Sequence, residues 1–198
     1  MQPHTLNTKT VTIFIRNMVS DSCMKVVKWE LERSGFIQVE DIELGKAVIH
    51  FNEGVVNDEF INAILKRNGF ALINDSEARL VEQIKHAVIE LIFFGNNTNS
   101  LIRNSDYLSQ KLEQPYVALS KIFSKHTGVT LEKFIIQIKI ERVKEFISYD
   151  DLSLSEISYR MGYSSVAHLS AQFKQTTGET VQDYKKEFHQ RRTPLNKI

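Results

Sequence analysis

The sequence contains a single cysteine, Cys23, among its 198 residues. One cysteine cannot form an intramolecular disulfide, so the disulfide frameworks of small secreted proteins are excluded. Long hydrophobic runs are also missing, because the longest, 87–94, is interrupted by Glu90 and is far too short to cross a bilayer. The first residues, MQPHTLNTK, lack the apolar core of a secretion signal. We therefore expect a cytoplasmic protein that makes no contact with a membrane.

Motifs of the common enzyme classes are absent as well. The chain has no P-loop, G-x-G-x-x-G, G-x-S-x-G or H-E-x-x-H sequence. Its six histidines are scattered along the chain, and Cys23 has no local partner for nucleophilic catalysis. We predict that the protein is not an enzyme and that it carries no cofactor.

Positive and negative charges nearly balance over the whole chain, but they are unevenly distributed between its two halves. The formal net charge is +1. Residues 1–75 carry eight Lys and Arg against ten Asp and Glu, whereas residues 100–198 carry fifteen against eleven. The C-terminal half is therefore the positive one, which is a mild indication that it meets an anion.

The first 75 residues alternate between the periods of strands and helices. Alternating, β-branched segments predict four strands, at 10–17, 36–44, 47–51 and 70–74. Helical spacing predicts helices at 21–35 and 57–69, with Asn57 as an N-cap. The resulting order, β-α-β-β-α-β, predicts an α+β domain over residues 1–75 with the ferredoxin-like fold.

From Ser76 onward the strand pattern disappears, and we predict an all-α domain over residues 76–198. Helical spacing and capping residues predict seven helices, at 76–94, 105–112, 116–126, 131–149, 154–161, 166–176 and 181–189. Ser153 and Glu156 have the spacing of a capping box at the start of one of them.

A repeat runs through this second half. The segments ALSKIFSKHTGVT (118–130) and HLSAQFKQTTGET (168–180) share Leu, Ser, Phe, Thr, Gly and Thr at equivalent places. Each copy is a short helix, a turn of three or four residues and a second helix, which is the helix-turn-helix pattern. The leucine and the phenylalanine of each copy lie four residues apart, so one face of each second helix is expected to be fixed in the core.

The helix predicted between the two copies, 131–149, has a length that suits DNA. At about 1.5 Å per residue it spans nearly 30 Å, and successive major grooves on one side of a duplex are about 34 Å apart. We therefore predict that one chain places two reading helices in successive major grooves of double-stranded DNA. Two alternatives remain at this point: a packing duplication without a ligand, and an interaction protein that has lost DNA binding.

Residues of about 80–190 resemble the DNA-binding domain of the AraC/XylS-type bacterial transcription regulators. The segments that carry the resemblance are LSKIFSKHTGVTLEKFI, IKIERVKEFI, SLSEISYRMGYSSVAHLSAQFKQTTG and DYKK. The family's usual R-L-x-x-A reads Lys139-Ile-Glu-Arg-Val143 here, and its proline after the second glycine is replaced by Val181. The resemblance implies seven helices, with the second helix of each repeat in a major groove. It also leaves open RNA polymerase as a second partner beside DNA.

The repeat and the resemblance together indicate which side chains meet DNA. Lys121 can donate to guanine O6 and N7, and Val117 can pack on a thymine methyl group. Gln172 can pair with adenine or lean towards the core, and His168 can meet a base edge or a phosphate or have no role. The residues predicted to face DNA are Tyr116, Val117, Ser120, Lys121, Lys125, Ser164, Ser165, Val166, Ala167, His168, Ala171, Gln172, Lys174, Lys185 and Lys186.

These candidates have different predicted roles. Ser164 and Ser165 can offer donors to phosphate. Four lysines are predicted to contact phosphates: Lys125, Lys174, Lys185 and Lys186. Taken singly, each is also typical of a solvated surface. At one position where the two copies differ, the first copy has Lys121 and the second has Ala171. We therefore expect unlike half-sites, with the stronger direct readout at the first.

The first half resembles a heavy-metal-associated domain. That family's M-x-C-x-x-C loop reads Met18-Val-Ser20-Asp-Ser-Cys23 here, so a serine replaces the first thiolate. Soft Cu(I) or Zn(II) needs at least two good soft or borderline ligands. We therefore expect a regulatory or dimerising module without a metal. The alternative is a metal-responsive regulator that uses Met18 and Cys23, and nothing in the sequence places His4 or His50 beside them.

Overall fold

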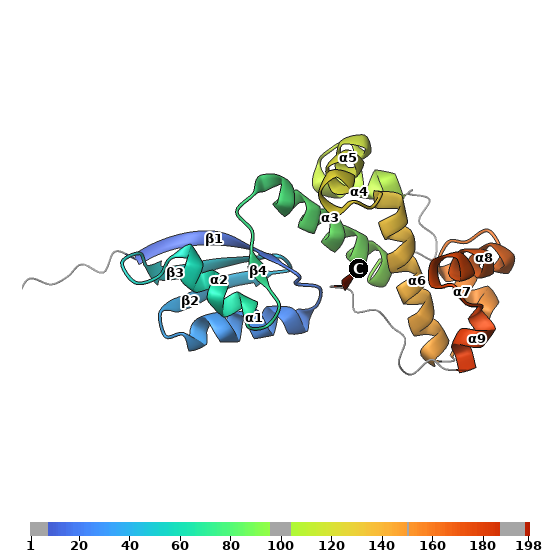
Figure 1. The fold of residues 1–198 in the computed structure, drawn as a ribbon, viewed down its shortest axis with the longest axis horizontal. Helices are drawn as coiled ribbons and strands as arrows, with labels where there is room; N and C mark the ends of the chain where they lie inside the picture. The colour runs from blue at the N-terminus through green and yellow to red at the C-terminus, as the bar shows by residue number, and fades with distance from the viewer. Residues whose placement is uncertain (1–7, 96–103, 150, 187–196) are drawn as a thin grey trace, which may run out of the picture. The chain divides into compact units, whose positions relative to one another are not determined.

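The computed structural model describes residues 8–95, 104–149, 151–186 and 197–198, and the chain divides into two compact units, Met1–His86 and Ala87–Ile198 (Figure 1). The division falls inside helix α3 (Ser76–Phe93), whereas the sequence predicts a domain boundary between residues 75 and 76. Within the described residues, no helix has both the length and the apolar character that a membrane span requires.

Unit 1 is a small antiparallel sheet with two helices. Its strands are β1 (Thr8–Arg16), β2 (Ile37–Glu43), β3 (Lys46–Asn52) and β4 (Ala71–Leu72), in the order β2-β3-β1-β4. Helix α1 (Asp21–Arg33) follows β1, and helix α2 (Asp58–Lys66) follows β3. The predicted succession of strands and helices is therefore present.

One face of the sheet forms the core of unit 1 because buried and exposed residues alternate along the strands. Ile13 and Ile15 of β1 and Ile49 of β3 point into this core, where they meet Leu31 of α1 and Ile61 of α2. Helix α1 packs against β2, α2 packs against β4, and the two helices contact each other. Asn57 caps α2 as predicted, since its side chain accepts the N–H of Phe60 at 2.8 Å.

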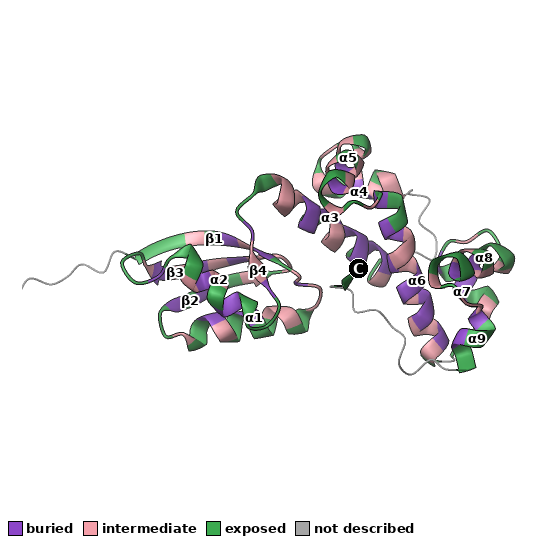
Figure 2. Cartoon of the chain, viewed as in Figure 1, coloured by how far each residue is buried: buried purple, intermediate pink, exposed green. Residues whose placement is uncertain are grey.

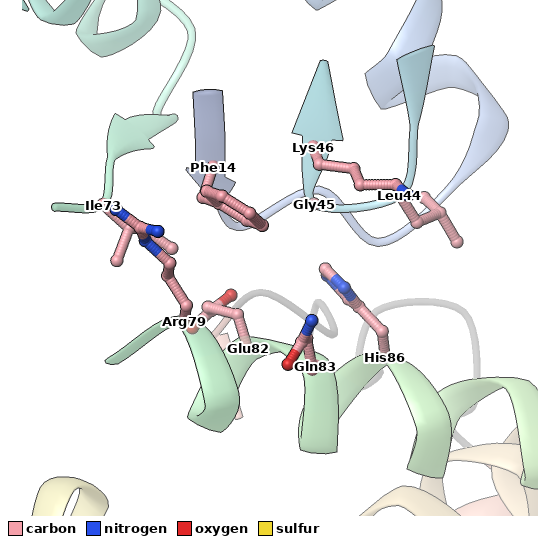
Figure 3. Close-up of a pocket in the computed structure, with 9 residues that line it drawn as sticks. All are labelled: Phe14, Leu44, Gly45, Lys46, Ile73, Arg79, Glu82, Gln83 and His86. Carbon is pink, nitrogen blue, oxygen red and sulfur yellow. The ribbon is translucent and has the colours of Figure 1, made fainter. Parts of the chain in front are cut away.

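The first turns of α3 belong to unit 1 because their side chains find partners there. The guanidinium of Arg79 lies 4.4 Å from the centre of the Phe14 ring. Glu82 is only 5% exposed, and it accepts the backbone N–H of Asn17 at 3.2 Å. Figure 3 shows Arg79, Glu82 and His86 projecting from α3 towards the end of β1 and the β2–β3 turn. Periodicity alone cannot reveal these contacts, which is why the sequence indicates a boundary before α3.

Gly45 and His86 lie in close contact at the β2–β3 turn. Gly45 has a φ of +82°, and a Cβ there would lie 2.4 Å from Cε1 of His86. Both the left-handed backbone and the lack of space therefore require glycine. A cavity of ≈ 30 Å³ separates the surrounding side chains, and Nε2 of His86 is buried with no hydrogen-bond partner among the described residues.

Unit 2 is helical. After the end of α3 it contains six helices in the described residues: α4 (Asn104–Leu112), α5 (Tyr116–Thr127), α6 (Leu131–Tyr149), α7 (Leu154–Arg160), α8 (Val166–Thr177) and α9 (Val181–Lys186). Helix α6 runs between the two repeats and is largely buried or half-buried along its length (Figure 2). The predicted end of the last helix, at 189, lies outside the described residues.

The buried histidine predicts a pH-dependent stability of unit 1. Burial lowers the pKa of His86 below its usual 6.5, against the opposing effects of Glu82 and of a hydrogen bond with the Met18 backbone. The unfolded chain then takes up the proton at a higher pH than the folded unit. The free energy of unfolding therefore falls as the pH drops through 6.5, by at most about 1.4 kcal/mol per pH unit, until the folded-state pKa is passed.

His86→Gln is expected to remove this part of the pH dependence. Denaturant unfolding between about pH 7.5 and pH 5.5 measures it, with fluorescence of the single tryptophan, Trp29 of α1 in unit 1, as the signal. His126→Gln, at an exposed position of α5, is the matched control. Equal pH dependence in wild type and His86→Gln would contradict the prediction.

Candidate nucleic-acid interface

The repeat forms two helix-turn-helix elements. In the first, α4 and α5 flank the turn 113–115, and in the second, α7 and α8 flank the turn 161–165. The second turn is longer than the predicted three or four residues, because α7 already ends at Arg160 and Met161 is its C-cap. Both second helices end at a glycine with left-handed backbone, Gly128 with φ 72° and Gly178 with φ 86°.

The residues shared by the copies are structural. Leu119 and Leu169 are both 0% exposed, and Phe123 and Phe173 are 1% and 0% exposed. The shared threonine has the same task in both copies. The hydroxyl of Thr177 donates to the carbonyl oxygens of Phe173 at 2.8 Å and Glu179 at 3.2 Å, and Thr127 makes the equivalent pair of bonds. The leucine, phenylalanine and threonine that the copies share therefore stabilise the motif. The outer face of each second helix is formed by residues that differ between the copies.

The outer face of α5 carries Val117 and Lys121. The Val117 side chain is 79% exposed, and Lys121 lies one turn further along the same face, also exposed. Lys125 follows on that face, whereas Ser120 is half-buried. Three of the predicted residues therefore share one exposed face of α5, and their contact with DNA stays a prediction.

Tyr116, at the start of α5, is hydrogen-bonded to a residue of helix α6. Its hydroxyl donates to Oε1 of Glu132 in α6 at 2.9 Å. Burial and the neighbouring Glu132 carboxylate both raise the pKa of Tyr116, so the phenol stays protonated. The side chain therefore joins the first reading helix to α6.

The outer face of α8 is made of small residues and one histidine. Ala167 and Ala171 are exposed, and Val166 is half-buried. The ring of His168 lies 5.2 Å from the Tyr163 ring in an edge-on arrangement, and its Nδ1 is 3.1 Å from the hydroxyl of Ser164. His168 is therefore held by its neighbours at the start of the helix.

Gln172 and the terminal lysines complete the predicted set. Gln172 is half-buried and donates through Nε2 to Oε1 of Gln175 at 3.3 Å. The predicted lean towards the core is therefore only partial. Lys174, Lys185 and Lys186 are exposed, on α8 and α9. The Nζ of Lys186 lies 3.9 Å from a carboxylate oxygen of Asp183.

The structure also brings together residues from both repeats that the sequence did not connect. Tyr116, His168 and Gln172 line one cleft of unit 2 with Lys139 of α6 and Tyr163 of the second turn. In the sequence, Lys139 stands out only as a departure from a family motif. No sequence signal pairs it with Tyr163, because the contact depends on how α7 packs on α6.

The M-x-C-x-x-C-like loop of unit 1 does not fit a soft metal ion. Met18 is 0% exposed in the core, and the Cys23 sulfur lies 3.3 Å from the hydroxyl of Ser20, which caps α1. His50 is engaged elsewhere, with Glu40 at 2.8 Å, and His4 lies outside the described residues. Across the part of the chain that the structure describes, no three His, Cys, Asp or Glu side chains gather as a metal site would require.

Ser165 caps α8, and its loss has a predictable cost. Its side chain accepts the backbone N–H of His168 at 3.1 Å. Ser165→Ala is expected to lower the free energy of unfolding of unit 2 by about 1 kcal/mol, which thermal melting followed by circular dichroism can measure. Ser164→Ala is the matched control, because its exposed hydroxyl contacts only the His168 ring in the described structure and makes no cap. Equal melting temperatures for the two variants would contradict the assignment of the cap.

Comparisons with known proteins agree with the duplicated motif. Residues 108–187 match the family described as "Helix-turn-helix domain". The chain is 28% identical over 114 residues to the Msm operon regulatory protein of Streptococcus mutans, covering 58% of this chain and 38% of that protein. It is 26% identical over 99 residues to the uncharacterized HTH-type transcriptional regulator YdiP of Escherichia coli, covering 50% of this chain and 33% of that protein.

Among solved structures, the C-terminal domain of AraT, a response regulator from Geobacillus stearothermophilus, gives a TM-score of 0.46 at 19% identity. The match covers 57% of this chain and 88% of that one. The chain spans well under half the length of the two curated relatives named above. Residues 108–187 of the chain therefore carry a helix-turn-helix domain, and the curated relatives that the chain resembles include HTH-type transcriptional regulators.

Proposed function

We propose that the whole chain is a sequence-specific transcription regulator, in which α5 and α8 each enter a major groove of double-stranded DNA. The observation that carries the proposal is a contrast within the repeat. The shared leucines and phenylalanines are buried, whereas Val117 and Lys121 of the first copy and Ala167 and Ala171 of the second, which differ between the copies, are exposed. Helix α6 separates the two motifs, and its 19 residues span about 28 Å at 1.5 Å per residue. Successive major grooves lie at a similar spacing of about 34 Å.

The first reading helix has the chemistry for direct readout. Lys121 presents an ammonium that can donate to O6 and N7 of guanine. Val117 is an apolar side chain left 79% exposed, and covering such a side chain is worth about 1.5–3 kcal/mol when burial is complete. A thymine methyl group is an apolar surface that the major groove offers for this contact.

The second reading helix has less chemistry for direct readout. Ala167 and Ala171 allow close approach but form no hydrogen bonds through their side chains. His168 is held by Ser164 and Tyr163, and Gln172 is already bonded to Gln175. We propose that the second half-site is read mainly through DNA shape and through His168, and that the two half-sites differ in sequence.

The lysines outside the reading positions supply affinity. Lys125, Lys174, Lys185 and Lys186 are exposed at or near the ends of α5, α8 and α9. Contacts from such side chains to phosphates release counterions, so their contribution falls as salt rises and is independent of base sequence.

We propose that unit 1 has the ferredoxin-like fold of a heavy-metal-associated domain, retained as a regulatory or dimerising module. The strand order β2-β3-β1-β4 and the succession β-α-β-β-α-β support the fold. Ser20 in place of a thiolate and Met18 in the core argue against metal sensing. In this proposal the protein acts in the cytoplasm, RNA polymerase is its further partner, and a homodimer forms through unit 1.

Two lysine substitutions test the roles assigned at the interface. With a site selected from a random DNA pool, Lys121→Ala is expected to cost about 1–3 kcal/mol at that site and to relax the preference for one base pair. Lys185→Ala is expected to weaken all sequences alike and to reduce the salt slope by about 1. Mobility shifts over a salt series measure both effects.

Lys25→Ala, at an exposed position of α1 in unit 1, is the matched charge control and is expected to leave binding unchanged. If neither Lys121→Ala nor Lys185→Ala altered affinity, preference or salt slope, the assigned interface would be wrong. If the selection yielded no enriched sequence, sequence-specific binding itself would be refuted.

A further inference from the structure

The cleft between the two repeats of unit 2 has the size of a small-molecule site. Its volume is ≈ 440 Å³, within the roughly 300–1,000 Å³ that ligand pockets occupy. Its walls come from the starts of α4 and α5, the first half of α6, the second turn and the first turns of α8. The described residues that line the cleft all belong to unit 2.

Lys139 places in this cleft a cation that forms no ion pair with any residue the structure describes. Its Nζ donates to the carbonyl oxygen of Met161 at 3.1 Å and lies 5.7 Å from the centre of the Tyr163 ring. An ammonium has three donors, so donors remain for a ligand. Burial lowers the pKa of Lys139, and no carboxylate among the described residues offsets this effect. A bound anion would supply the missing compensation.

Tyr163 adds a second unused donor. Its hydroxyl is buried and has no hydrogen-bond partner among the described residues. Burial raises the pKa of Tyr163 to about 12, so the phenol is protonated at neutral pH and can donate. A buried polar group without a partner is unfavourable, and a ligand acceptor would satisfy it.

The remaining walls combine an apolar patch on α6 with polar side chains of α4 and α8, namely Asn104, Ser105, His168 and Gln172. Ile135 is buried and Ile136 is half-buried, and both line the cleft. Glu132 also lines it, with one carboxylate oxygen accepting from Tyr116. A second negative group on the Glu132 side would be repelled, so a dianion fits less well than a monoanion.

We propose that this cleft binds a small organic monoanion, a carboxylate on an apolar body of one or two rings, with the negative group beside Lys139 and Tyr163 and the body against Ile135 and Ile136. The same cleft is lined by His168 and Gln172 of the second reading helix. The effect on DNA rests on the proposed function. The bound ligand lowers the affinity of the protein for DNA, because it adds negative charge beside the predicted DNA-facing surface. By linkage, DNA lowers affinity for the ligand to the same extent.

The binding test uses the full chain without DNA. Acetate, benzoate and indole-3-acetate are titrated by calorimetry, with benzamide as the uncharged counterpart of benzoate. Saturable binding is expected for benzoate, stronger for indole-3-acetate and weaker for acetate, since more apolar surface is buried. Benzamide is expected to bind roughly tenfold or more weakly, because hydrogen bonds to charged groups are the stronger ones.

Substitutions assign the site. Lys139→Met, of similar length, is expected to weaken benzoate binding roughly tenfold or more, whereas Lys133→Met, at an exposed position of the same helix, is expected to leave it unchanged. Tyr163→Phe removes only a hydroxyl that has no hydrogen-bond partner among the described residues, and it is expected to weaken binding several-fold while keeping the fold. If circular dichroism shows that Lys139→Met is unfolded, the result for Tyr163→Phe decides whether the ligand binds in this cleft.

The proposal is overturned if no carboxylate binds saturably at millimolar concentration, if benzamide binds as well as benzoate, or if the folded variants bind like wild type. Mobility shifts with indole-3-acetate test the coupling to DNA. In Tyr163→Phe the same loss of DNA affinity should require a several-fold higher concentration of indole-3-acetate. Because calorimetry contains no DNA, intact ligand binding without DNA binding would count against the proposed function alone. Ligand binding that leaves DNA affinity unchanged would overturn the coupling.

Discussion

Each reading helix is held in place by a leucine and a phenylalanine one turn apart, and the orientation of its exposed face depends on that pair. The ring of Phe123 lies 5.0 Å from that of Phe134 in α6, and the ring of Phe173 lies 5.5 Å from that of Tyr184 in α9. Complete burial of one such side chain contributes about 1.5–3 kcal/mol. This packing separates the residues that hold the helix from the exposed residues to which the proposed function assigns DNA contact.

Helix α6 connects these two anchors and contains an ion pair inside the protein. Nζ of Lys144 lies 2.7 Å from Oε1 of Glu141, and both residues are almost inaccessible. The same Nζ lies 5.9 Å from the centre of the Tyr184 ring, so α6 is joined to the helix that supports Phe173. Removing one partner of a buried ion pair typically costs about 3–5 kcal/mol. A fixed spacing of the two reading helices depends on α6 staying intact.

Much of the fold could be predicted from the sequence because its signals are local. Ser153 and Glu156 form the expected capping box, with Glu156 accepting the N–H of Ser153 at 2.8 Å. The glycines that end both reading helices have the left-handed backbone that such positions favour. Periodicity identified the helices for the same reason, since each buries one side against the rest of its own unit.

The parts that could not be predicted depend on contacts between distant residues. Periodicity continues through α3, so it cannot show that Arg79 and Glu82 find their partners in unit 1. The meeting of Lys139 with the carbonyl of Met161 likewise requires α7 to be packed on α6. In the candidate interface, exposure at Val117 and Lys121 followed from helical spacing, whereas the bond from Tyr116 to Glu132 did not.

The most direct test of the central claim is a hydroxyl-radical footprint of the full chain on a selected DNA fragment. The account predicts two protected segments on one face of the duplex, with centres one helical turn, about 10 base pairs, apart. A single protected segment, or two segments on opposite faces, would contradict the claim that one chain places both reading helices in successive major grooves.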